Sequence, residues 1–64
     1  MLNNIERFRL QKGMQLTKLS ELSSVSIGYL SRLESGYKKN PSYNIMKKIA
    51  KALGKTIGDV FPTH

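Results

Sequence analysis

Residues 15–36 read QLTKLSELSSVSIGYLSRLESG, and this stretch decides the fold. Leu19 and Leu22 fall on the apolar side of a first helix, and Leu30 and Leu33 recur three residues apart on a second helix. The serines between the two leucine pairs are weak helix formers, which favours a turn. The pattern therefore predicts two short helices joined by a tight turn, with the rest of the chain as their scaffold.

Polar residues set the limits of this helix pair. Gln15 opens the first helix, and Ser24 is expected at the turn position that often prefers glycine because its φ is positive. Ser26 is a natural N-cap for the second helix and Gly36 is a natural stop. The second helix is therefore predicted at about residues 27–35.

The segment before the pair predicts another helix, at about residues 3–12, which Asn3 or Asn4 can cap. Ile5 and Phe8 form an apolar pair on it, and Arg9 lies beside them on the inward side. The stem of Arg9 is then partly buried and its head group needs an acidic partner. Glu34 is the candidate.

The segment after the pair begins with a basic loop, residues 37–40, which ends at Pro41. Ser42 can cap the next helix, and Gly54 can end it. The apolar residues of this helix recur with a helical period at Ile45, Met46, Ile49, Ala50 and Leu53. Thr56 then caps a short final segment, whose apolar residues are Ile57, Val60 and Phe61.

The chain shows no alternation with a period of two, no internal repeat and no linker. We therefore predict that residues 1–64 form a single all-α domain of five short helices, with the helix-turn-helix made by the second and third. A chain of 64 residues buries little surface, so the core must be compact.

Composition narrows the function. Eleven Lys and Arg against four Asp and Glu give a formal charge of +7, which favours a polyanionic partner such as nucleic acid or an anionic membrane. The absence of cysteine excludes disulfides and thiolate metal sites, and His64 has no second imidazole with which to bind a metal. No apolar run is long enough to span a bilayer, and no signal-peptide pattern is present. We expect a cytoplasmic protein without metal, cofactor, small-molecule ligand or enzymatic activity.

The helix at residues 27–35 turns a small, polar face away from its leucines, and such a helix can enter the DNA major groove. Arg32 could bond guanine O6 and N7, Ser31 or Ser35 could bond bases or phosphates, and Ile27 could contact a thymine methyl. Gly28 would let the backbone approach closely. The alternative for Arg32 is that it does not contact DNA and is a solvated surface residue that forms an ion pair within its helix.

Backbone contacts are expected on both sides of this helix. Gln15 and Thr17 can grip a phosphate at the start of the first helix of the pair, and Tyr29 can reach a phosphate or pack against its own domain. The full set of expected DNA-binding residues is Gln15, Thr17, Ser26, Ile27, Gly28, Tyr29, Ser31, Arg32, Ser35, Lys38, Lys39 and Asn40. Ser26 serves first as a cap.

Several motifs together resemble the Cro/repressor-type, or Xre-like, helix-turn-helix family over nearly the whole chain. They are I-x-x-F-R-x-x-x-G near the start, LSELSSVSIGYLSRLESG in the centre, NPS in the loop, and IAKALG before TIGDVF. The spacing of YLS-x-LE and NPS looks especially like the developmental and biofilm repressors of spore-forming bacteria. The chain departs from the family at Leu16, where glutamine is usual, and at Ser20 and Ser24, where alanine and glycine are usual.

The resemblance implies a compact five-helix, lambda-repressor-like fold in which the third helix reads DNA. It also implies that Arg9 and Glu34 form a partly buried salt bridge. The residues matching the family's DNA contacts are Gln15, Ile27, Gly28, Tyr29, Arg32 and Ser35, with Lys38 and Lys39 on the backbone.

We therefore expect a sequence-specific, double-stranded-DNA-binding transcriptional regulator, a repressor rather than an activator. It would bind a near-palindromic operator as a homodimer. Ile57, Val60 and Phe61 are the candidates for a dimer seam, although they could equally close the core. The alternative function is a helical protein-interaction module, such as an antitoxin or adaptor, in which DNA binding is secondary. An effector domain could follow the chain.

Overall fold

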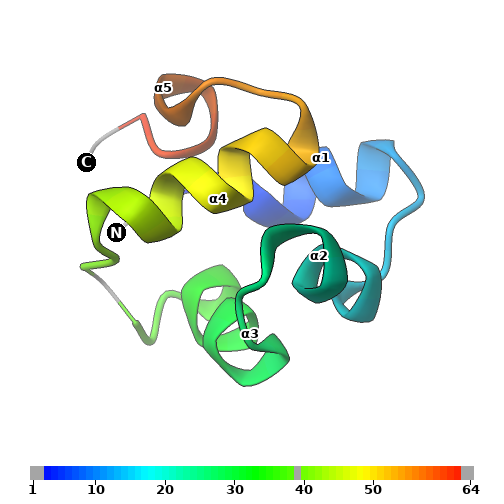
Figure 1. Cartoon of the computed structure of the whole chain (residues 1–64), viewed down its shortest axis with the longest axis horizontal. Helices are drawn as coiled ribbons and strands as arrows, with labels where there is room; N and C mark the ends of the chain where they lie inside the picture. Colours follow the sequence, from blue (N-terminus) through cyan, green and yellow to red (C-terminus); the bar gives the residue numbers. More distant parts are fainter. Residues whose placement is uncertain (1–2, 39, 63–64) are drawn as a thin grey trace.

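A computed structural model describes residues 3–38 and 40–62, and its regular structure is helical throughout (Figure 1). The helices of this part of the chain are α1 (Ile5–Gln11), α2 (Leu16–Ser23), α3 (Ile27–Ser35), α4 (Tyr43–Leu53) and α5 (Ile57–Val60). The prediction of an all-α fold with five helices is confirmed, and α3 has the predicted bounds.

Helix α4 crosses the molecule and packs against α1, α2 and α5, while α2 also packs on α3 (Figure 1). Its predicted apolar stripe lies in the core, where Ile49 and Leu53 are fully buried. The buried apolar residues come from all five helices and from the segments beside them: Ile5, Leu19, Val25, Leu30, Leu33, Met46, Ile49, Ala50, Leu53, Val60 and Phe61. One shared core thus fixes the relative positions of α2 and α3.

Side chains before three of the helices satisfy backbone groups at the helix starts. The hydroxyls of Ser26, Ser42 and Thr56 each accept a hydrogen bond from the backbone N–H three residues ahead, as predicted. The Asp59 carboxylate completes a capping box by accepting from the backbone N–H of Thr56. The hydrogen bonds from Thr56 hold the pKa of Asp59 below its usual value.

Two asparagines attach the start of the chain to distant helices. The side chain of Asn3 donates to the carbonyl of Leu33 at 2.9 Å, and the side chain of Asn4 donates to the carbonyl of Asp59 at 2.8 Å. Asn3 also accepts from the backbone N–H of Ile5. Helix α1 therefore begins at Ile5 rather than at residue 3, because both asparagines are used in tertiary contacts outside the helix.

Arg9 and Glu34 form the predicted ion pair between α1 and α3. Nε of Arg9 donates to one carboxylate oxygen at 2.7 Å and Nη2 donates to the other at 3.2 Å. Nη1 donates to the carbonyl of Met14 at 2.8 Å, just before α2. The two side chains are only 11% and 10% exposed, and the hydrogen bond to Glu34 raises the pKa of Arg9. One guanidinium thus joins three segments.

The prediction that Leu22 lies on the apolar side of α2, facing the core, is wrong. Leu22 is 50% exposed, and Ser23 is buried in its place, with its hydroxyl donating to the carbonyl of Leu19 at 2.7 Å. At 100° per residue, Ser23 lies about 40° from Leu19 around the helix axis, closer than Leu22, which lies about 60° away on the other side. The apolar side of α2 is therefore narrower than its leucines indicate.

The predicted dimer seam also needs a correction. Val60 and Phe61 are fully buried within a single chain, and only Ile57 is partly exposed. Because buried side chains offer no surface to a second chain, Val60 and Phe61 close the core, which was the alternative interpretation.

Replacing Glu34 by Gln should lower the free energy of unfolding by about 1.5–3 kcal/mol, since Arg9 would keep its charge in a largely buried position without a countercharge. The measurement is urea denaturation at neutral pH. Glu21→Gln is the matched control, because Glu21 is exposed on α2 and should change stability by less than about 0.5 kcal/mol. Equal effects of the two substitutions would contradict a structural role for the pair.

Candidate nucleic-acid interface

The turn between α2 and α3 is held by serine hydroxyls. Ser20 donates to the carbonyl of Val25 at 2.6 Å, and Ser23 accepts from the backbone N–H of Val25 at 3.3 Å. Ser24 has the predicted positive φ, at 59°. Val25 is 4% exposed and inserts into the core directly after the turn. These contacts fix the angle at which α3 leaves α2.

Helix α3 presents one face to the core and the opposite face to solvent. Leu30 and Leu33 are fully buried, as predicted. The residues on the opposite face, referred to below as the α3 face, are all exposed and comprise Ile27, Gly28, Ser31, Arg32 and Ser35. Because most of them are short, the helix backbone lies close to whatever binds this face.

Arg32 and Gly28 lie together on the α3 face. A Cβ atom added to Gly28 would lie 4.0 Å from Nη1 of Arg32, so the guanidinium extends back along the helix over the glycine. It thereby brings five hydrogen-bond donors toward the N-terminal half of α3. A cation at this end of a short polar face is suited to an acceptor-rich surface such as a guanine edge.

The serines on and beside α3 differ in how many hydrogen bonds they have left to make. Ser26 accepts from the backbone N–H of Tyr29 at 3.2 Å, which leaves its O–H free to donate. The Ser35 hydroxyl donates to the carbonyl of Arg32 at 3.1 Å and accepts from the backbone N–H of Tyr37 at 3.4 Å. Ser35 is therefore engaged at the end of its own helix, a role that the helical pattern did not indicate.

A basic and aromatic strip follows α3. The Nζ of Lys38 lies 5.4 Å from the ring centroid of Tyr29, within the range of a cation–π contact, and Tyr29 is half-buried. The backbone N–H of Lys38 donates to the carbonyl of Arg32 at 3.0 Å, which ties the strip to the helix. Asn40 is exposed, and Lys39 lies outside the described residues.

Two exposed tyrosines were not among the DNA-binding residues expected from the sequence. Tyr37, in the loop between α3 and α4, is 80% exposed, and Tyr43, the first residue of α4, is 62% exposed. Their hydroxyls can donate to phosphate oxygens beside Lys38. The signal in the sequence is that Tyr37 begins the basic loop, Tyr43 closely follows it, and neither belongs to an apolar helical stripe.

The start of α2 offers a second cluster of donors. Gln15 is the N-cap residue and its side chain makes no capping hydrogen bond, so its amide is available, and Thr17 is exposed. Both residues line a shallow hollow of about 480 Å³, together with Lys12, Gly13, Met14 and Lys18. Sequence reasoning did not include the two lysines, although both lie within three residues of Gln15.

The described part of the chain holds neither a cluster of metal-binding side chains nor a membrane-spanning helix. No group of three or more His, Cys, Asp or Glu side chains there could hold a metal ion. No helix among those residues is both long and apolar enough to cross a membrane.

Known proteins resemble this chain over most of its length. A model of the helix-turn-helix family matches residues 5–60. The chain is 35% identical over 57 residues to the HTH-type transcriptional regulator SlrR of Bacillus subtilis, covering 89% of this chain and 38% of SlrR. It is 32% identical over 53 residues to the HTH-type transcriptional regulator SinR of Bacillus subtilis and of Bacillus licheniformis, covering 83% of this chain and 48% of SinR.

The family resemblance carried by the sequence motifs is thereby confirmed. The chain spans less than half the length of these curated relatives.

Replacing Ser24 by Gly should raise the free energy of unfolding by about 0.5–1 kcal/mol, because glycine adopts a φ of 59° without strain. Thermal and urea denaturation measure the change. Ser31→Gly is the control, since Ser31 lies inside α3 and the same substitution there should lower stability by about 0.5 kcal/mol. A loss of stability at both positions would show that the turn is not strained.

Proposed function

The chain belongs to the helix-turn-helix family, and from this premise we propose that it is a sequence-specific, double-stranded-DNA-binding transcriptional regulator. It acts in the cytoplasm as a repressor and catalyses no reaction. The observation that carries the proposal is the α3 face, where Arg32 lies over Gly28. This surface is exposed, most of its side chains are short, and the exposed Lys38 follows it. The relatives SlrR and SinR are named as HTH-type transcriptional regulators, which supports the proposal.

Recognition takes place in the major groove, which is about 12 Å wide and admits one helix. The glycine and serines of the α3 face let the helix sit deep, and Arg32 donates two hydrogen bonds to O6 and N7 of a guanine. Ile27, 44% exposed at the start of α3, packs against a thymine methyl. Ser31 bonds a neighbouring base edge or a phosphate.

Phosphate contacts hold α3 in this position from two sides. At the start of α2, Gln15 and Thr17 bind one strand, assisted by the positive end of the helix dipole. Beyond α3, Lys38 and Asn40 bind the backbone together with Tyr37. These contacts supply most of the affinity but carry no sequence information, so specificity rests on Arg32 and its neighbours.

A single short helix in one groove binds weakly, and we propose that two chains occupy a near-palindromic operator with half-sites about one helical turn apart. Occupying such a site blocks access by other proteins, which is the simplest way in which a small DNA-binding domain represses. Ile57 is the only predicted seam residue that is still partly exposed and thus available for the contact between the two chains.

Replacing Arg32 by Ala should weaken binding by about 1–3 kcal/mol on a duplex enriched by this protein from a random pool, and less on unselected duplex. Fluorescence anisotropy at fixed salt measures both affinities. Arg7→Ala is the matched control, because it removes the same charge from exposed α1 and should affect both duplexes slightly and equally. Equal losses for Arg32→Ala on both duplexes would make it a phosphate contact.

Affinity for duplex DNA should fall with salt, with log K against log salt decreasing by about 0.9 for each phosphate contacted. Replacing Lys38 by Ala should reduce the magnitude of this slope by about one contact and leave sequence preference unchanged. A salt titration of both proteins measures the slopes. An affinity that is independent of salt would contradict the proposed backbone contacts.

A further inference from the structure

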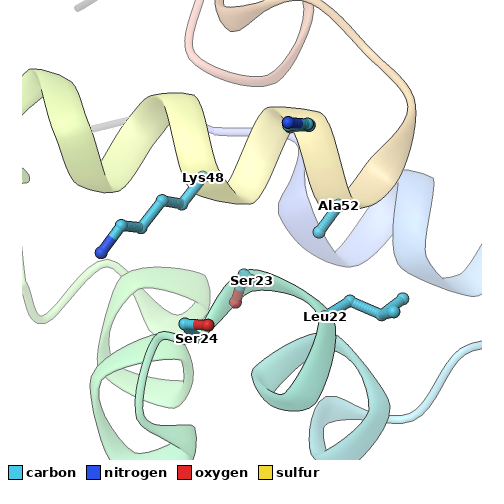
Figure 2. A pocket seen from close by; sticks show the side chains of 6 residues that line it. Leu22, Ser23, Ser24, Lys48 and Ala52 are labelled. Atoms are coloured by element: carbon cyan, nitrogen blue, oxygen red, sulfur yellow. The ribbon is translucent and has the colours of Figure 1, made fainter.

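A second hollow lies between the α2–α3 turn and α4, outside the α3 face (Figure 2). It has a volume of about 480 Å³ and opens to solvent. Its lining residues are Leu22, Ser23, Ser24, Lys48, Lys51 and Ala52. Since no residue of α3 lines it, an occupant would leave the α3 face free for DNA.

The hollow is apolar at one end and cationic along α4. Leu22 is 50% exposed and Ala52 is partly exposed, and Figure 2 shows these two side chains at the same end. Lys48 extends past the other end. Lys48 and Lys51 are three residues apart, so both project from the same side of α4, and both are exposed.

Neither lysine has a carboxylate partner among the described residues, where the ion pair formed is that of Arg9 with Glu34. The carboxylate of Asp59 is already engaged, because it accepts a hydrogen bond from the backbone N–H of Thr56. The whole chain carries a formal charge of +7. The hollow therefore combines exposed apolar surface with two ammonium groups that nothing in this part of the chain neutralises.

We propose that this hollow is a docking site for an acidic segment of a partner protein. A carboxylate of the segment binds Lys48 and Lys51, and an adjacent apolar side chain packs between Leu22 and Ala52. A second copy of the chain fits poorly, because it would bring another +7 of charge against the same lysines. DNA phosphates could pair with the lysines but would leave the apolar end uncovered.

A direct probe is a synthetic helical peptide that carries two glutamates at i and i+4 beside one leucine, compared with the same peptide bearing glutamines. Titration into the ¹⁵N-labelled protein should shift the amide signals of residues 22–24 and 48–52, and the glutamine peptide should bind much more weakly. Amides of the α3 face should not move. Shifts centred on α3, or equal binding of both peptides, would overturn the proposal.

Paired variants separate a built site from general charge attraction. Lys48→Ser with Lys51→Ser should weaken binding of the glutamate peptide about tenfold, as should Leu22→Ser through its apolar contact. Arg7→Ser with Lys47→Ser removes the same charge from exposed positions that do not line this hollow, and should weaken binding about twofold or less. Equal losses in the two double variants would overturn the proposal.

Affinity for DNA is measured on the same proteins, so the proposed docking site and the proposed DNA-binding function are tested independently of each other. Lys48→Ser with Lys51→Ser should keep the sequence preference for DNA. A duplex titration that shifts residues 48–52 as strongly as the α3 face would assign the hollow to the DNA interface and overturn the docking site. Concentration-dependent shifts of these signals in the free protein would assign it to self-association and likewise overturn it.

Discussion

The partly buried ion pair between Arg9 and Glu34 is the interaction on which the arrangement of the other helices depends. A domain of this size without disulfides has only a small core, so a polar contact that joins three segments has a large influence. Arg9 connects α1 to the last turn of α3 through Glu34, and to the start of α2 through the carbonyl of Met14. The pair therefore fixes both helices of the helix-turn-helix relative to α1.

The orientation of α3 has consequences for what its outer face can do. Leu30 and Leu33 hold the helix from the core side, Ser26 fixes its start, and Lys38 is tied back to its last turn. The α3 face is left exposed. Most of its side chains are short, and the guanidinium of Arg32 lies over Gly28. A helix held so firmly meets a groove without first being ordered, which lowers the entropic cost of binding.

Local signals in the sequence were sufficient to predict much of the fold. The bounds of α3, the serine and threonine caps and the positive φ of Ser24 depend on neighbouring residues, and all were predictable. The pairing of Arg9 with Glu34 was also predictable, because an inward-facing arginine needs a countercharge.

What was not predictable depends on contacts between distant segments. The burial of Val60 and Phe61 depends on α5 folding back over the core. The hollow beside α4 likewise appears only when the helices are assembled. Helical periodicity identifies which side of a helix is apolar, but not how much of that side a neighbour covers.

The claim that α3 reads DNA through the major groove is tested most directly by removing the groove's own acceptor. In a duplex enriched by this protein, each guanine is replaced in turn by 7-deazaguanine, which lacks N7 but pairs normally. We predict that one guanine in each half-site weakens binding of the native protein by about 1 kcal/mol or more, and that the Arg32→Ala variant no longer distinguishes the two bases at that position. If no guanine is sensitive, or if Arg32→Ala retains the full sensitivity, α3 does not read the groove through Arg32.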